Sequence, residues 1–162
     1  IPPEMLVEAR EAEVVWRAAR WIIDQATVIL AHNAEFDRQF CPDLGKPWVC
    51  SENDIKWPGQ ARGGSLVHLA LSLGVGVVTA HRAMADVDTL VRILMRLAEK
   101  GHDLEQLIRW GLRPKATYHA VVSYDDRQKA KDNGFRWDGK NWWRKMAPQD
   151  TEGLPFPVRV VL

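Results

Sequence analysis

The segment TVILAHNAEFD, residues 27–37, decides the fold class of this chain. Its first half, residues 27–31, is a short β-branched and aliphatic run bounded by polar residues, which predicts a strand buried on both faces of a mostly parallel sheet. The polar half begins at His32, and Asn33 is a suitable N-cap for a helix that carries Asp37 one turn in. Ligands of α/β proteins bind where such a strand ends and a helix begins, so the segment predicts an α/β fold with a candidate site at this point.

The flanking sequence predicts further helices and a second strand. Residues 11–25 and 83–100 show apolar residues at three- and four-residue intervals, which predicts two amphipathic helices. The apolar stripe of the first consists of Val14, Val15, Ala18, Trp21 and Ile22. The second shows Met84, Val87, Val91, Leu94 and Ala98 on one face, flanked by Leu90 and Leu97. Residues 47–51 predict a strand, and residues 65–73 predict a helix that ends at Gly74.

The charge balance changes near the Arg113-Pro114 step. Residues 1–114 hold 13 Lys and Arg against 15 Asp and Glu, whereas residues 115–147 hold 8 against 4. Six of the 14 aromatic residues also lie in this second, basic stretch. Cations and flat apolar rings in one short segment are typical of nucleic-acid-binding surfaces.

The chain is therefore expected to consist of a first domain and a small second unit. We place the first domain at residues 1–103, a linker at 104–115, a basic, aromatic-rich module at 116–147 and a tail at 148–162. Within the module the pattern predicts a strand, a polar helix and then a hairpin that turns at its Asp-Gly pair. The tail ends in VRVVL, which is a candidate closing strand.

Two motifs carry a resemblance to a known family. Residues 32–37 fit the pattern HNAxFD, and residues 81–86 fit HxAxxD. In this order, after an apolar strand and before a long helix, they resemble the DEDDh exonucleases, the DnaQ-like family of the proofreading subunit of bacterial DNA polymerase III. The resemblance implies a ribonuclease H-like α/β fold and a 3'-to-5' exonuclease that hydrolyses single-stranded DNA to nucleoside monophosphates. A ribonuclease of the same superfamily is the alternative within hydrolases.

The resemblance also implies the chemistry of the site. Two Mg²⁺ or Mn²⁺ ions would stabilise the attacking and departing oxygens, and such hard cations bind carboxylates. Asp37 and Asp86 match metal ligands of the family, and His81 matches its general base. Since His81 and Asp86 are five residues apart, we expect the base on a loop and the ligand within the following helix. The rest of the first motif supports the site through His32, Asn33 and Phe36.

Each of these residues also has a purely structural interpretation. Asp37 and Asp86 suit the first turn of a helix, where a carboxylate interacts favourably with the helix dipole. His81 can be a solvated loop residue, and His32 and Asn33 can serve to cap the helix and orient the end of the strand.

The family's first motif, an Asp-x-Glu on the first strand, does not occur before His32, where only 31 residues precede it. The nearest acids, Glu11 and Glu13, fall in a predicted helix. We therefore expect a ribonuclease H-like exonuclease fold missing its first strands, with an exposed sheet edge. Two carboxylates instead of about four predict weak metal binding and no activity in the chain as given.

Three explanations of the missing motif remain open. Because the chain begins at Ile1 rather than Met, the first is a partial reading frame of a working exonuclease. The second is complementation by another chain. The third is a catalytically inactive homologue retained as a nucleic-acid-binding or polymerase-associated subunit.

The second unit resembles a small module found in DNA-processing proteins, in which AKxxGxxWD precedes WxxK. The matching residues are Ala130, Lys131, Gly134, Trp137, Asp138, Trp142 or Trp143, and Lys145. A single-strand clamp would use rings for base stacking and cations for phosphates. Its candidate residues are Arg136, Trp137, Trp142, Trp143 and Lys145. In the alternative, Phe135, Trp137 and one of Trp142 and Trp143 form the module's core, and alternation leaves at most one of those two neighbours free.

Composition restricts the cellular setting. No apolar run approaches the roughly 20 residues needed to span a bilayer, and the beginning of the chain does not resemble a secretory signal. Cys41 and Cys50 lack metal-type spacing and are expected to be free thiols, which fits a reducing cytoplasm. The expected partners are single-stranded nucleic acid, DNA rather than RNA, and by resemblance a DNA polymerase or repair complex; no membrane partner is expected.

Overall fold

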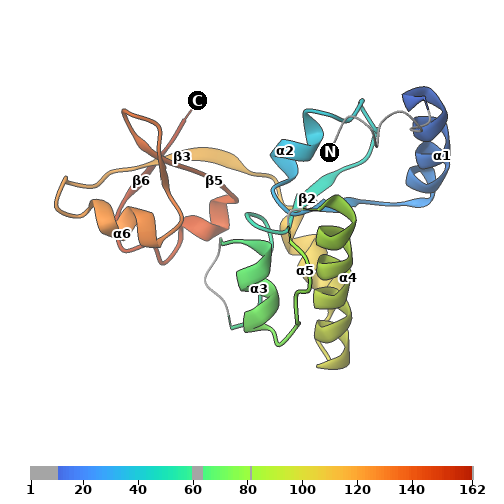
Figure 1. The fold of residues 1–162 in the computed structure, drawn as a ribbon. Coiled ribbons are helices and arrows are strands. Elements are labelled where there is room, and N and C mark those ends of the chain that lie inside the picture. Colours follow the sequence, from blue (N-terminus) through green and yellow to red (C-terminus); the bar gives the residue numbers. More distant parts are fainter. Residues whose placement is uncertain (1–10, 60–63, 81, 162) are drawn as a thin grey trace.

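The structure, a computed structural model, describes residues 11–59, 64–80 and 82–161. It confirms a mixed α/β chain with small sheets. Figure 1 shows two parts, with strand β3 (Ala116–Ala120) leading from the first into the second.

The first part holds the predicted strand and helix of the opening segment. Its elements in chain order are α1 (Ala12–Gln25), β1 (Ile29–Ala31), α2 (Ala34–Arg38), β2 (Trp48–Cys50), α3 (Leu66–Ser72), α4 (Ala83–Glu99) and α5 (Leu104–Gly111). Strands β1 and β2 pair in parallel, with Leu30 opposite Val49. The elements predicted at residues 27–31, 47–51 and 65–73 are thereby confirmed within a few residues. The expectation that the first strand would be buried on both faces was wrong, because β1 is only partly buried.

The core of the first part lies where α3, α4 and α5 meet β2. Its fully buried members include Val49, Ile55, Ile93 and Leu97, which come from β2, the loop after it and α4. Helix α3 begins at Ser65, whose hydroxyl accepts a hydrogen bond from the backbone N–H of His68. Burial of these aliphatic side chains is the main contribution to the stability of this part.

The apolar faces that the sequence shows on two helices do not coincide with buried surfaces. Helix α1 buries none of its residues, and Trp21 on its apolar stripe is 71% exposed. In α4 the buried row runs through Leu90, Ile93 and Leu97, whereas Met84 on the face seen in the sequence is 79% exposed. Since α4 has apolar residues on two sides, periodicity alone did not show which side faces α3 and α5.

Helix α1 is held to the first part by polar contacts. Arg20 donates to the backbone oxygen of Asp43 over 3.3 Å, and Lys46 donates to that of Asp24 over 3.2 Å. In the part of the chain that the structure describes, the sheet of β1 and β2 has two strands and offers no face to the apolar stripe of α1.

The expected linker at residues 104–115 is mostly helical. Helix α5 occupies its first half, and Leu104, Leu107 and Ile108 pack against the first core. The three- and four-residue spacing of these apolar positions is that of an amphipathic helix. Only residues 112–115 connect α5 to β3.

The second part is the predicted strand, helix and hairpin, closed by a strand from the tail. After β3 it contains α6 (Arg127–Asp132), β4 (Arg136–Trp137), β5 (Trp142–Met146), the 3-10 helix η2 (Pro148–Thr151) and β6 (Val158–Val160). The antiparallel sheet has the order β4-β5-β3-β6. The closing strand expected in the tail is confirmed as β6, so the module continues beyond residue 147.

The module has its own small core. Ala130, Phe135 and Met146 are buried in it, and Trp142 packs against them. The ring of Phe135 meets that of Phe156 edge to face. Trp137 does not belong to this core, because its side chain is 54% exposed; the expectation that it would fill the module was wrong.

Gly111 marks the closest approach of α5 to β2. A Cβ atom at this position would lie 2.6 Å from Cγ1 of Val49, a stiff β-branched side chain inside the core. We predict that Gly111→Ala lowers the free energy of unfolding by about 1–3 kcal/mol, measured by urea denaturation, because the helix must move away from the strand. Gly76→Ala is the control, since no atom lies within 4 Å of its added methyl. Equal effects of the two substitutions would contradict the packing argument.

Candidate functional site

The first motif lies where β1 ends and α2 begins. Asn33 holds the N-cap position of α2, but with φ 65° and ψ 50° it is in the left-handed region. Asn is one of the few residues that adopt this conformation readily. Its side chain makes no capping hydrogen bond, so the expectation of a side-chain cap was wrong. Asn33 instead provides the turn that carries the chain from the strand into the helix.

His32, which follows β1, contacts the residue that follows β2. Its Nδ1 lies 2.9 Å from the hydroxyl oxygen of Ser51, a buried residue that follows β2. Burial lowers the pKa of His32, while the charges of Glu52 and Asp86 and a backbone hydrogen bond with Gly64 act in the opposite direction. Asp86 of the second motif is thus near enough to His32 for its charge to raise the pKa of the ring.

The set of expected metal ligands is incomplete among the described residues. Asp37 on α2 and Asp86 in the first turn of α4 are both partly exposed, and no described hydrogen bond or ion pair joins them. His81, the expected base, lies outside the described residues. Phe36 points to the surface and contacts Phe40, with 5.1 Å between ring centroids.

No two-metal site can be assembled from these side chains. Across residues 11–59, 64–80 and 82–161, no group of three or more His, Cys, Asp and Glu side chains could hold a metal ion. Two adjacent divalent ions need about four carboxylates, and the motifs supply two. The residues described therefore do not fit the metal pair that the resemblance implies.

A large open cleft lies between the first part and the module. Its volume is about 770 Å³. The side of the first part is formed by α2, β2 and the loop after β2, and the other side by the hairpin and α6. All five module residues singled out in the sequence line it: Arg136, Trp137, Trp142, Trp143 and Lys145.

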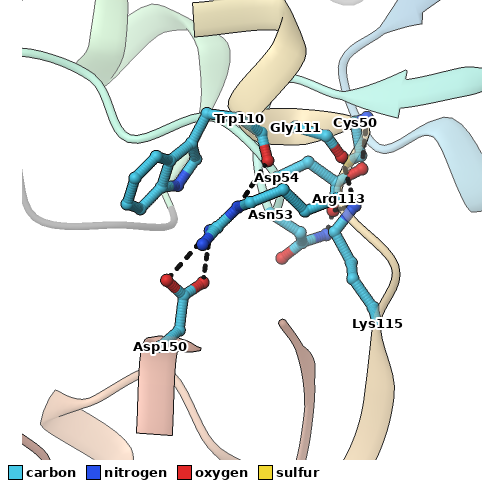
Figure 2. Close-up of polar contacts among 8 residues, drawn as sticks. All are labelled: Cys50, Asn53, Asp54, Trp110, Gly111, Arg113, Lys115 and Asp150. Atoms are coloured by element: carbon cyan, nitrogen blue, oxygen red, sulfur yellow. Dashed lines mark hydrogen bonds and ion pairs between the residues drawn. The ribbon is translucent and has the colours of Figure 1, made fainter. Parts of the chain in front are cut away.

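Two ion pairs fix the segment that joins the two parts (Figure 2). Lys115 lies 3.1 Å from a carboxylate oxygen of Asp54, whose other oxygen accepts the backbone N–H of Cys50 over 2.8 Å. Arg113 donates to both carboxylate oxygens of Asp150, each at 2.9 Å. We call these two pairs the junction pairs. The first ties the residue before β3 to the loop after β2, and the second ties the segment after α5 to η2.

The guanidinium of Arg113 is also held from its other side. It stacks over the ring of Trp110 with 3.6 Å to the centroid, and its Nε donates to the backbone oxygen of the same residue. Planar stacking of this kind orients the fork of Arg for a bidentate bond to Asp150. The direction of the chain between α5 and β3 is therefore determined by side chains on both parts.

The sequence did not indicate the other side of the cleft. Arg38 and Trp48 line it from α2 and β2, and the guanidinium of Arg38 lies 5.9 Å from the centroid of the Trp48 ring. They are far from the module in the chain, and no local pattern connects the two segments. The two segments line one cleft only because the two parts of the chain are folded next to each other.

One family matches a part of the chain. Residues 116–161 match a domain of unknown function (DUF8626). This span runs from β3 through β6 and coincides with the second part of the structure. No curated protein and no solved structure matches the chain significantly.

The remaining expectations concern thiols and membranes. Cys41 and Cys50 are free, as predicted, and Cys50 is buried. None of the helices in the described ranges is long and apolar enough to cross a bilayer.

The bond between Arg113 and Asp150 can be measured by a double-mutant cycle. We predict a coupling free energy of about 2 kcal/mol between Arg113→Gln and Asp150→Asn in urea denaturation, because the pair is bidentate and largely buried. The same cycle on the exposed pair of Arg109 and Glu105 should give little coupling. Equal coupling in the two cycles would contradict a special role for the Arg113 pair.

The lowered pKa of His32 predicts a dependence of stability on pH. Because the folded protein disfavours the charged imidazole, protonation below the unfolded value of about 6.5 stabilises the unfolded chain. The free energy of unfolding should fall as the pH decreases from 7.5 to 5.5. This decrease should be smaller in His32→Gln, measured by denaturation at both pH values. An unchanged pH dependence in the variant would refute the assignment.

Proposed function

We propose that this chain belongs to a metal-dependent 3'-to-5' exonuclease of the DnaQ-like type, with a ribonuclease H-like fold, that acts on single-stranded nucleic acid. One observation carries the proposal: the first motif lies where β1 ends and α2 begins, and the charge of Asp86 in the second motif raises the pKa of His32 there. In α/β proteins this end of a strand is where ligands bind.

The chemistry of the proposed reaction defines what else is needed. Hydrolysis of a phosphodiester adds negative charge to an anionic centre, which is why this class of enzyme uses two divalent cations. Asp37 and Asp86 would contribute to holding Mg²⁺ or Mn²⁺, and His81 would accept the proton of the attacking water. Further carboxylates are required besides these two, so the proposal assigns hydrolysis to a protein that supplies them.

A second candidate is a catalytically inactive nucleic-acid-binding subunit with the same fold. It is favoured by the difference between the motif region and the cleft. The motif region has too few carboxylates for two ions, whereas the cleft is lined by several Lys and Arg side chains and four tryptophans. Such a subunit would bind the strand and leave its hydrolysis, or its synthesis by a polymerase, to a partner.

Asp86 and Asp88 provide a matched test of the metal assignment. Both lie near the beginning of α4, but Asp88 is in an exposed ion pair with Arg92 at 2.8 Å. We predict that Asp86→Asn weakens the binding of Mn²⁺, followed by electron paramagnetic resonance, whereas Asp88→Asn does not. Equal Mn²⁺ binding by the two variants would refute Asp86 as a ligand.

The same variants separate the two candidate functions. A single-stranded oligonucleotide labelled at its 5' end reports shortening from the 3' end in the presence of Mg²⁺ or Mn²⁺. In a protein that supplies the further carboxylates, shortening should be lost in Asp86→Asn and retained in Asp88→Asn. Absence of shortening by that protein, together with strand binding, would favour the inactive subunit. Matched DNA and RNA oligonucleotides would distinguish a deoxyribonuclease from a ribonuclease.

A further inference from the structure

The contacts of Arg136 show which face of the hairpin is turned toward the first part. Its guanidinium lies 3.6 Å from a carboxylate oxygen of Glu52 and donates to the side-chain oxygen of Asn53 over 3.3 Å. Arg136 is the register partner of Trp143 in the sheet, so the two side chains are on the same face. Lys145 follows Trp143 by two residues and shares this face too. One side of β4 and β5 therefore presents a ring and two cations to the first part.

Cations exceed carboxylates among the residues that line the cleft. The cations are Arg38, Arg113, Lys115, Lys131, Arg136, Arg144 and Lys145, whereas the acids are Glu35, Glu52 and Asp54. Lys115 and Arg113 are occupied by the junction pairs. Lys131 and Lys145 are exposed and make no ion pair within the described residues. The cleft therefore has two exposed lysines without an ion-pair partner among the described residues. An extended polyanion can bind such lysines and release its counterions.

The rings in the cleft add a second kind of contact. Trp137 is the most exposed of them, and its ring lies 5.6 Å from that of Trp142 at an angle of 49°. As the register partner of Trp142 it lies on the face opposite Arg136, and it lines the cleft from the edge strand β4. Trp48 lies on the opposite side of the cleft, close to Arg38. Unpaired bases stack on such rings, whereas the base faces of a duplex are covered by their neighbours. Rings combined with cations therefore select a single strand.

The cleft extends to the region of the first motif. Gly64 lines the cleft and also makes the backbone hydrogen bond with His32. Helix α2, which carries Asp37, contributes Glu35 and Arg38 to the lining. A strand bound along the hairpin can thus continue to the carboxyl end of β1.

We infer that the cleft between the two parts is a binding path for single-stranded nucleic acid, with Lys131 and Lys145 contacting phosphates and Trp137 stacking on a base. This inference deepens the proposed function and rests on it only for the hydrolysis of the bound strand. Residues of the module bind the strand, and one end of the bound strand lies at the first part.

Binding measured without divalent metal tests the inference separately from catalysis. Fluorescence anisotropy of labelled oligo-dT and oligo-U in EDTA gives the affinity of the whole chain while hydrolysis is prevented. We expect Trp137→Ala to weaken binding about tenfold, the loss typical of one stacked base. The double variant Lys131→Ala/Lys145→Ala should weaken binding at low salt. It should also make the dependence of log affinity on log salt shallower by roughly 0.7 per lysine.

Exposed residues of the same type outside the cleft provide the controls. Trp21→Ala on α1 and Lys100→Ala after α4 remove an exposed ring and an exposed cation far from the lining residues. Both should leave the affinity unchanged, and circular dichroism should verify that all variants are folded. Equal affinities of the cleft and control variants, or equal affinity for a duplex of the same length, would overturn the inference. A negative result in the nuclease assay alone would not change the expected binding results.

Discussion

The relative placement of the two parts depends on the junction pairs. Arg113 is held between the ring of Trp110 and the carboxylate of Asp150, and Lys115 is held by Asp54. Arg113 and Lys115 both lie in the short segment between α5 and β3. A carboxylate that loses its partner in such a partly buried place keeps its desolvation cost, so each pair resists separation. The cleft forms because these contacts hold the short segment between α5 and β3 in one conformation.

Local sequence patterns were sufficient for most of the helices and strands. The β-branched run before His32 formed a strand, the Asp-Gly pair formed the hairpin turn, and VRVVL formed the closing strand. Each of these features depends on neighbours in the chain, where turn chemistry and side-chain alternation are decisive. Helix α5 was also present in the pattern as Leu104, Leu107 and Ile108, but Gly111 and Pro114 suggested a linker.

Features that depend on distant residues were not predictable in the same way. The apolar positions of α4 allow two different inward faces, and only its packing against α3 and α5 selects Leu90, Ile93 and Leu97. Beside the cleft, Arg136 donates a hydrogen bond to Asn53, which is 83 residues away in the chain. The motif residues were recognisable as a pattern, but their carboxylates do not complete a site by themselves, since the sequence motif specifies residue types and not the number of ligands within reach.

The second part has its two chain ends side by side. Strand β3 begins at Ala116 and β6 runs antiparallel to it, so that the backbone N–H of Val161 donates to the oxygen of Thr117. A segment that enters and leaves at one point can be inserted into a host protein without separating the host's own flanking residues. The sheet and core of this segment are also its own. The geometry thus makes it transplantable, a unit that evolution can attach to unrelated catalytic or scaffolding chains.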